Sequence, residues 1–222
     1  MNSSVPCAEQ CRTIASVAIA FCMAITMCSC ESSTRVASNH EYFRLEDALR
    51  DPLDVRALNL YYAPCNGFSN EILNMKNLHT LIMPRCSIDS LPDGICDLPI
   101  EWLELQGNRL SKFPRQIFCM KKLYVLILSK NSIPRIPDSL DLLEEFVGFR
   151  MDSCGLASLP KSFVKFKCRN IWLNANEISV LPDSLSQMKG TLQYLNLKNN
   201  PISQRERDRI LSELTPGVEV VF

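Results

Sequence analysis

Few side chains in this sequence stand at spacings that could perform catalysis. Ser158 and Lys161 have the spacing in which a lysine can activate a serine, but no supporting motif follows them. A serine–histidine–carboxylate triad would need His40 or His79, the only two histidines. Phosphate-binding glycine loops and the H-E-x-x-H motif are also absent from the sequence. We therefore expect a protein that is not an enzyme and uses no metal or cofactor.

Length and charge narrow the class of protein further. The 222 residues are 46% apolar and 22% charged, which suits a folded chain with a sizeable core. The 24 basic and 24 acidic side chains cancel. Nucleic-acid binding is disfavoured, because it needs a basic surface for the phosphates.

The N-terminal segment has the composition of a targeting signal. Residues 13–29 contain no charge, and Ser29 places a small residue directly before Cys30. This junction resembles the lipobox of bacterial lipoproteins, which implies that residues 1–29 form a signal peptide and that Cys30 is the lipid attachment site. Two alternatives are an uncleaved membrane anchor and an apolar start on a cytosolic protein.

Seven repeats follow, and they carry the strongest pattern in the sequence. They start at Val55, Leu78, Ile100, Leu123, Phe146, Cys168 and Leu192, with spacings of 22 to 24 residues. Positions four, six and eleven of the repeat are apolar, apart from a cysteine at position eleven of the first: Leu58, Leu60, Cys65; Leu81, Met83, Ile88; Leu103, Leu105, Leu110; Leu126, Leu128, Ile133; Phe149, Met151, Leu156; Ile171, Leu173, Ile178; Leu195, Leu197, Ile202. A fixed period of this length indicates a solenoid.

Over residues 55–202, the pattern L-x-x-L-x-L-x-x-N-x-L resembles the leucine-rich repeat of the typical L-P-x-x-I class. Five of the repeats carry the apolar–proline pair of that class: Leu91-Pro92, Phe113-Pro114, Ile136-Pro137, Leu159-Pro160 and Leu181-Pro182. The resemblance implies an α/β solenoid, a horseshoe of about seven repeats with a parallel sheet on its concave side. The first half of each repeat would form the strand.

Position nine of each repeat should turn inward, where an asparagine amide can satisfy backbone groups of the turn. Four repeats have asparagine there: Asn108, Asn131, Asn176 and Asn200. Cys86 and Cys154 take the same position in two others, and the family pattern accepts cysteine there. These asparagines are predicted to be structural.

Both ends of a solenoid need caps. Residues 30–54 are expected to be a tether and an N-terminal cap helix, with Tyr42, Leu45, Ala48 and Leu49 on one side. Residues 203–222 should form the C-terminal cap, a charged helix to about Leu214 followed by a closing strand.

The cysteines within the repeats occupy ladder, core and convex positions, and no pair has C-x-x-C spacing. We therefore expect buried free thiols. The cysteine-rich caps of secreted eukaryotic repeat proteins are absent, which favours a bacterial origin or a cytosolic location.

Aromatic residues divide unevenly between the two sides of the expected solenoid. Both tryptophans and four of the five tyrosines fall on the concave side, where Trp and Tyr would be suited to anchoring a protein interface. Cross-strand pairing, which favours aromatic residues on any sheet, is the alternative explanation. The candidate partner-binding residues are Tyr61, Arg85, Trp102, Glu104, Tyr124, Arg150, Trp172 and Tyr194.

These features together predict a monomeric lipoprotein, anchored by lipid in the membrane of a bacterial cell envelope, that binds a protein or peptide through its concave face. A cytosolic leucine-rich repeat scaffold or regulator of a signalling protein is the alternative. A purely structural spacer on the cell surface is a third possibility.

Overall fold

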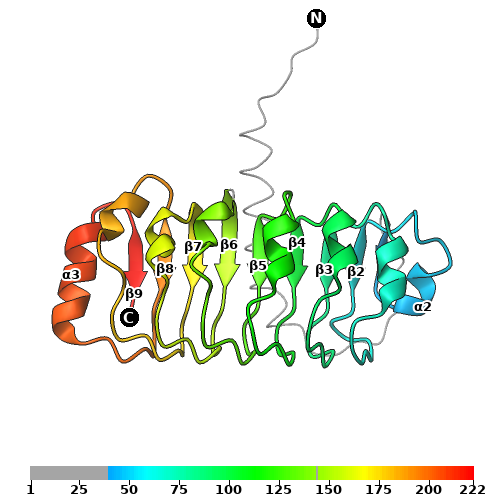
Figure 1. Ribbon diagram of the computed structural model, residues 1–222, viewed down its shortest axis with the longest axis horizontal. Coiled ribbons are helices and arrows are strands. Elements are labelled where there is room, and N and C mark those ends of the chain that lie inside the picture. The colour runs from blue at the N-terminus through cyan, green and yellow to red at the C-terminus, as the bar shows by residue number, and fades with distance from the viewer. Residues whose placement is uncertain (1–39, 144) are drawn as a thin grey trace, which may run out of the picture. The chain divides into compact units, whose positions relative to one another are not determined.

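The computed structural model describes residues 40–143 and 145–222, which form a single solenoid (Figure 1). Its nine strands make one sheet in which every neighbouring pair is parallel and the spatial order follows the chain order. The strands are β1 (Glu41–Tyr42), β2 (Ala57–Asn59), β3 (Thr80–Ile82), β4 (Trp102–Glu104), β5 (Val125–Ile127), β6 (Phe146–Arg150), β7 (Cys168–Trp172), β8 (Tyr194–Asn196) and β9 (Glu219–Val221). The predicted α/β solenoid with a parallel sheet is confirmed.

Short 3-10 helices cover the side of the sheet that faces the viewer in Figure 1. They are η1 (Asn70–Asn74), η2 (Asp93–Asp97), η3 (Arg115–Cys119), η4 (Leu140–Leu142), η5 (Lys161–Lys165) and η6 (Leu185–Met188). Proline precedes three of them and fixes the backbone where the chain enters the helix: Pro92, Pro114 and Pro160. Each 3-10 helix contributes one apolar residue with no exposed surface to the core: Ile72, Ile95, Ile117, Leu140, Phe163 and Leu185.

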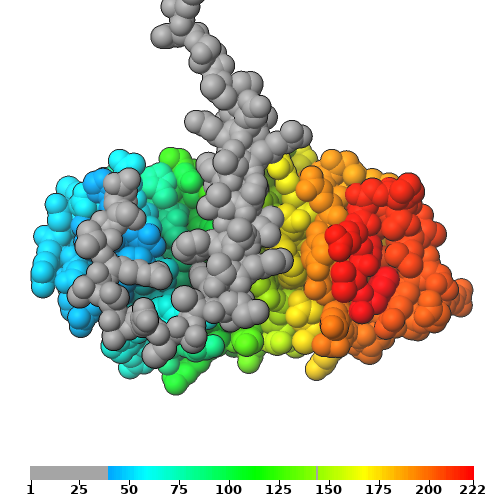
Figure 2. All heavy atoms as spheres, turned by 180° about the vertical axis from the view of Figure 1, so that it is seen from behind, coloured from blue at the N-terminus to red at the C-terminus, as the bar shows by residue number. Residues whose placement is uncertain are grey.

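The core lies between the sheet and these helices. Positions four and six of every repeat belong to it, and none of their side chains is more than 1% exposed. Because side chains alternate along a strand, the residues at positions three and five point to the opposite side of the sheet. We call that opposite surface the strand face; Figure 2 views the molecule from this side.

The four ladder asparagines join consecutive repeats. Asn108 accepts hydrogen bonds from the backbone of Cys86 and Ile88 at 2.9 and 3.0 Å, and donates to the carbonyls of Met83 and Leu105 at 2.9 Å. Asn131, Asn176 and Asn200 bond in the same way, each donating to a carbonyl of its own repeat and to one of the repeat before. Buried backbone groups of the turns are thereby satisfied.

Two disulfides correct the expectation that the cysteines are free thiols. Cys65 is bonded to Cys86, with Cα atoms 4.8 Å apart, and Cys96 is bonded to Cys119, with Cα atoms 5.5 Å apart. Each pair comes from adjacent repeats, 21 and 23 residues apart in sequence, so the stacking of the coils brings the cysteines together. They link the first repeat to the second and the second to the third.

Two further cysteines, Cys154 and Cys168, are free and buried. Burial raises the pKa of the Cys154 thiol to about 11 and raises that of Cys168 as well. Both thiols are therefore protonated at neutral pH and are poor nucleophiles.

The N-terminal cap differs from the expected helix. Glu41 and Tyr42 form strand β1 on the edge of β2, and only Leu45–Ala48 is helical, as α2. Tyr42 Oη donates to Asp54 Oδ2 at 2.7 Å, and this bond lowers the pKa of Asp54 below its ordinary range. Pairing with β2 satisfies backbone groups of Glu41 and Tyr42. A continuous helix would have moved these two residues away from the edge of the sheet.

The C-terminal cap consists of helix α3 (Gln204–Leu214) and strand β9, which pairs with β8. Ser203 accepts from the backbone N–H of Glu206 and caps the start of the helix. Glu206 and Arg209 join α3 to the backbone of Leu181 in the sixth repeat. The Leu181 N–H donates to Glu206 at 2.9 Å, and Arg209 donates to the Leu181 carbonyl at 2.8 Å. Among residues 40–143 and 145–222, no helix is long and apolar enough to cross a membrane.

Candidate protein-binding surface

The strand face presents two rows of side chains that cross the sheet. The first row, at position three of the repeats, is Ala57, Thr80, Trp102, Val125, Gly148, Asn170 and Tyr194. The second row, at position five, is Asn59, Ile82, Glu104, Ile127, Arg150, Trp172 and Asn196. Neighbours within a row are one strand apart, about 4.8 Å, so their side chains act on each other directly.

The middle of the strand face is apolar. Ile82, Val125 and Ile127 are apolar side chains on the strand face that do not belong to the core cluster. Trp102 lies beside Val125 in the first row, and its indole Nε1–H is buried with no acceptor in the described part of the chain. An indole N–H usually has a partner when buried, so Trp102 is an exception among the described residues.

A second aromatic group lies where the sheet approaches its C-terminal end. The rings of Trp172 and Tyr194 are 5.7 Å apart, on adjacent strands. Gly148 precedes them in the first row and has no side chain; a Cβ there would lie 3.7 Å from the Trp172 ring and 3.9 Å from Val125. A Cβ at this position would already be in van der Waals contact with both residues, so Val125 and Trp172 pack closely around Gly148.

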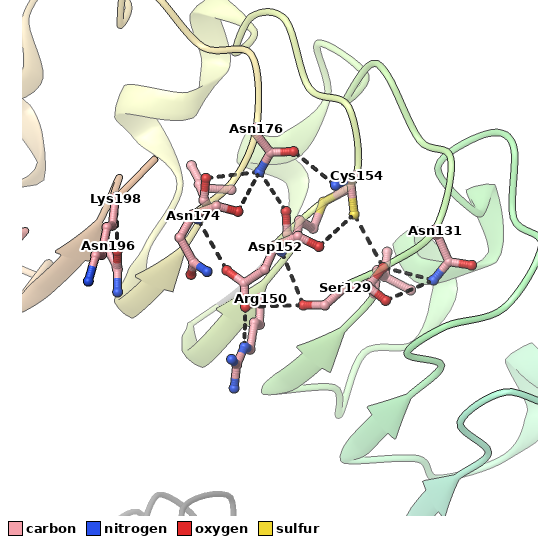
Figure 3. A network of polar contacts seen from close by, with 12 residues as sticks. Ser129, Asn131, Arg150, Asp152, Cys154, Asn174, Asn176, Asn196 and Lys198 are labelled. Atoms are coloured by element: carbon pink, nitrogen blue, oxygen red, sulfur yellow. Dashed lines mark hydrogen bonds and ion pairs between the residues drawn. The ribbon is translucent and has the colours of Figure 1, made fainter. Parts of the chain in front are cut away.

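Arg150 is the charged residue of this region, and a buried carboxylate holds it in place (Figure 3). Asp152 is 4% exposed and forms an ion pair with Arg150 Nε. The same carboxylate accepts from Ser129 Oγ at 3.4 Å and from Asn174 N–H at 3.2 Å. Because Asp152 engages only Nε, the other two guanidinium nitrogens can donate elsewhere.

Glu104 lies in the same row as Arg150, two strands away. It is 7% exposed, and burial raises its pKa to about 7, while the charge of Arg150 acts in the opposite direction. A carboxyl group in this state is partly protonated at neutral pH and can donate as well as accept hydrogen bonds.

The remaining candidates lie around this centre. Tyr61 and the 79% exposed Tyr62 pair edge to face, with ring centroids 4.8 Å apart, at the N-terminal end. Arg85 is exposed in a left-handed turn, and Tyr124 is partly buried directly before β5. The predicted residues therefore spread over the strand face, and only Trp172, Tyr194 and Arg150 form a close group around Gly148.

Sequence reasoning missed two parts of this arrangement. The sequence around Gly148 does not indicate that Val125 and Trp172 pack beside it, because both belong to other repeats. Asp152 was visible only as one more charge beside Arg150. Its role depends on Ser129 Oγ and on the backbone N–H of Asn174, which belong to the same position of the flanking repeats. The polar Ser129 at position seven was a usable signal.

Cys30 lies outside the described residues, so the lipid attachment site stays a prediction. In the part of the chain that is described, no three His, Cys, Asp or Glu side chains are grouped so that they could hold a metal ion.

The fold defines a class of protein: a parallel β-solenoid built from short repeats. Among solved structures, the chain is similar to a leucine-rich repeat protein of Leptospira interrogans, with 26% identity, a TM-score of 0.63, and coverage of 76% of this chain and 49% of that one. It is also similar to the Drosophila Toll–Spatzle complex, with 29% identity, a TM-score of 0.52, and coverage of 59% and 18%. The chain is a leucine-rich repeat protein.

The plant peptide hormone receptor RGFR1, in complex with RGF2, shares the fold at 22% identity, with a TM-score of 0.62 and coverage of 79% of this chain and 29% of the receptor. This chain thus spans about half of the Leptospira protein and less of the other two. No protein-family model and no curated protein matches the sequence.

Proposed function

We propose that this protein binds a protein or peptide partner through its strand face, as a non-enzymatic, lipid-anchored component of a bacterial cell envelope. The observation that carries the binding function is the grouping of Trp172, Tyr194 and the ion-paired Arg150 on one face. Trp, Tyr and Arg are enriched among the few residues that provide most of the binding energy at protein interfaces. Two of the similar structures are described as complexes, of a receptor with RGF2 and of Toll with Spatzle.

The two disulfides support a location outside the cytoplasm. Cytosolic proteins of most organisms keep their thiols reduced, whereas structural disulfides persist in the periplasm and at the cell surface. Cys65–Cys86 and Cys96–Cys119 both join neighbouring coils of the folded solenoid, which is the arrangement of a structural bond. They favour the envelope over the alternative of a cytosolic scaffold.

The anchor is tested by the intact mass and the N-terminal peptide of the natively expressed protein. We expect a chain that begins at Cys30 and carries acyl groups. An intact Met1 in the soluble fraction would contradict the lipoprotein proposal and would direct the search for a partner to the cytosol.

The binding face is tested with an identified partner. We expect Trp102→Ala combined with Trp172→Ala to abolish capture of that partner while the array stays folded. The matched control replaces two exposed apolar residues outside the strand face, Leu142 and Val180, which are 64% and 60% exposed, with alanine. Equal capture by both double variants would reject the strand face as the binding surface.

A further inference from the structure

A group of basic residues lies at one edge of the sheet, outside the strand face. Residues 84–92, 106–114 and 129–137 form the turns that follow strands β3, β4 and β5 (Figure 1). These turns hold five exposed basic residues and one acidic residue, Asp89, which gives a formal charge of +4. The corresponding turns of repeats one, five and six contain no basic residue. We call the five residues the basic edge: Arg85, Arg109, Lys112, Lys130 and Arg135.

The surrounding chain does not neutralise these charges. None of the five side chains forms an ion pair with a carboxylate among the residues that the structure describes. The next acids along the same repeats have other partners, since Asp93 pairs with Arg115 at 3.1 Å and Asp138 accepts from a backbone N–H of the fifth repeat at 3.0 Å. Lys112 and Arg135 both stand at position thirteen of adjacent repeats. Like charges on neighbouring coils repel each other, and a bound anion would relieve that repulsion.

Hydrogen bonds between the turns hold the backbone beneath these side chains. The Arg85 N–H donates to the Gln106 carbonyl at 2.8 Å, and the Arg109 N–H donates to the Ile88 carbonyl at 2.9 Å. Successive strands are about 4.8 Å apart, so the three turns present their charges as a short straight row along the solenoid. A row with a fixed backbone loses little conformational entropy when it binds a ligand.

The basic edge has no exposed apolar side chain to accompany its charge. Phe113, the aromatic residue of the three turns, is half-buried and packs against the core. A protein interface usually has an apolar centre, and single-stranded nucleic acid stacks its bases on aromatic side chains. Neither feature is present in these turns, which favours a ligand that is recognised by its charges. The large apolar residues that are exposed in the described chain all lie outside the three turns: Leu53, Tyr62, Leu142, Val180 and Leu211.

We infer that the basic edge binds a linear acidic polysaccharide whose sugars carry carboxylate groups. This site is separate from the strand face, and it rests on the proposed function only for the location at the cell surface, where such polymers are accessible. A stiff polysaccharide can place several anions along a straight row with little loss of conformational entropy, whereas a flexible acidic peptide loses more. Arginine suits the task because it donates two parallel hydrogen bonds to one carboxylate.

Four fluorescent polymers of similar length serve as probes of the full chain, and binding is followed by fluorescence anisotropy. They are polygalacturonate, its methyl ester, poly-glutamate and oligothymidylate. We expect polygalacturonate to bind most tightly and its uncharged ester not to bind. Binding of polygalacturonate should weaken as the ionic strength rises, because the contacts are exposed ion pairs.

Two multiple variants locate the site. Replacement of all five residues of the basic edge by glutamine should weaken polygalacturonate about fiftyfold, and Lys112→Gln with Arg135→Gln alone about fivefold, because each exposed ion pair contributes little. The matched control removes the same charge from the opposite edge of the sheet, where Asp141 and Glu145 lie among the lysines. It replaces five exposed lysines by glutamine and should leave binding within about twofold: Lys121, Lys122, Lys165, Lys167 and Lys189.

Several outcomes would overturn the inference. Equal losses in the basic-edge variant and the lysine control would show non-specific attraction. Poly-glutamate or oligothymidylate that binds as tightly as polygalacturonate would point to an acidic protein or a nucleic acid instead. Absence of polygalacturonate binding would reject the site outright.

The proposed function is tested separately. Trp102→Ala combined with Trp172→Ala should leave polygalacturonate binding unchanged, whatever it does to capture of a protein partner. Polygalacturonate binding that this double variant removes, and that the basic-edge variant keeps, would place the polymer on the strand face and overturn the inference. An intact Met1 in the soluble fraction would contradict the cell-surface location without changing the binding that these probes measure.

Discussion

At the scale of single residues, Asp152 has a structural role on the strand face. Its carboxylate is almost fully buried and joins three successive repeats through Ser129, Arg150 and the backbone of Asn174. A buried anion is tolerated only when such partners compensate for its lost hydration. The residue that positions the binding arginine is therefore also one that stabilises the fold.

Asp152→Asn keeps the shape of the side chain and removes its charge. We expect the free energy of unfolding to fall by about 1 to 3 kcal/mol, because Arg150 loses its ion pair and an NH2 group now faces the Asn174 N–H or Ser129. Urea unfolding at neutral pH measures the change. Asp89→Asn, at an exposed position, is the control, and equal effects of the two substitutions would contradict the role assigned to Asp152.

Asn108 illustrates a different residue role, since its amide makes four hydrogen bonds to buried backbone. Asn108→Ala should lower the free energy of unfolding by about 2 to 4 kcal/mol, because backbone groups are left without partners. Asn74→Ala in η1, where the asparagine is exposed, should change it by less than about 0.5 kcal/mol. Chemical denaturation compares the pair, and a cost for Asn108→Ala as small as that of the control would show that water replaces the amide.

At the scale of elements, the sequence predicted the strands of the repeats correctly. It was less accurate for the N-terminal cap, where the repeat pattern does not extend. The residues at positions four, six and eleven recur in every repeat and indicate where its strand and its core residues lie. The N-terminal cap has no such recurring positions. The spacing of Leu45, Ala48 and Leu49 suits a helix, whereas Glu41 and Tyr42 form a strand only because they pair with the edge of β2. Edge pairing is a tertiary effect that a local pattern does not encode.

The C-terminal cap gives a prediction on pH. The hydrogen bond from Arg209 lowers the pKa of Glu206, so the ionised form is favoured in the folded state. A lowered folded pKa contributes stability that is present at neutral pH and is lost as the pH falls through that pKa. We expect hydrogen exchange of α3, corrected for the intrinsic pH dependence of exchange, to accelerate in acid before that of the central repeats.

Glu206→Gln is the control for this effect. It keeps an acceptor for the Leu181 N–H but removes the ion pair with Arg209. In the variant, α3 should exchange faster already at neutral pH and should show a smaller further change in acid. An unchanged acid response would assign the effect to other carboxylates, such as Glu213, which also pairs with Arg209.

At the scale of the whole molecule, stacking creates contacts that no single repeat contains. The period predicted that coils stack, and hence the solenoid and its strand face. It did not reveal which cysteines become neighbours, because Cys65 and Cys86 occupy different positions, eleven and nine, of their repeats. The same limit applies to the site: the type of residue on the face was predictable, whereas the contacts of Asp152 with Ser129 and Asn174 in the flanking repeats depend on the geometry between coils.

Both disulfides lie in the first three repeats, and the two free cysteines of the described chain lie farther along the array. In a solenoid, each repeat is stabilised mainly by its neighbours, so a local cross-link acts locally. Reduction should therefore weaken the N-terminal repeats selectively, with a loss of about 2 to 4 kcal/mol per disulfide in the free energy of unfolding of that part. Hydrogen exchange with and without reductant, followed repeat by repeat, measures this directly.

The quadruple substitution of Cys65, Cys86, Cys96 and Cys119 by serine is the matched comparison. Without reductant it should reproduce the fast exchange of the reduced wild type in the first three repeats, and reductant should have no further effect on it. The repeats from Phe146 onward should exchange alike in all samples, because neither bond reaches them. Uniform loss of protection along the array would instead mean that the solenoid unfolds as one cooperative unit, and that these bonds stabilise the strand-face site at Arg150 as much as the coils they join.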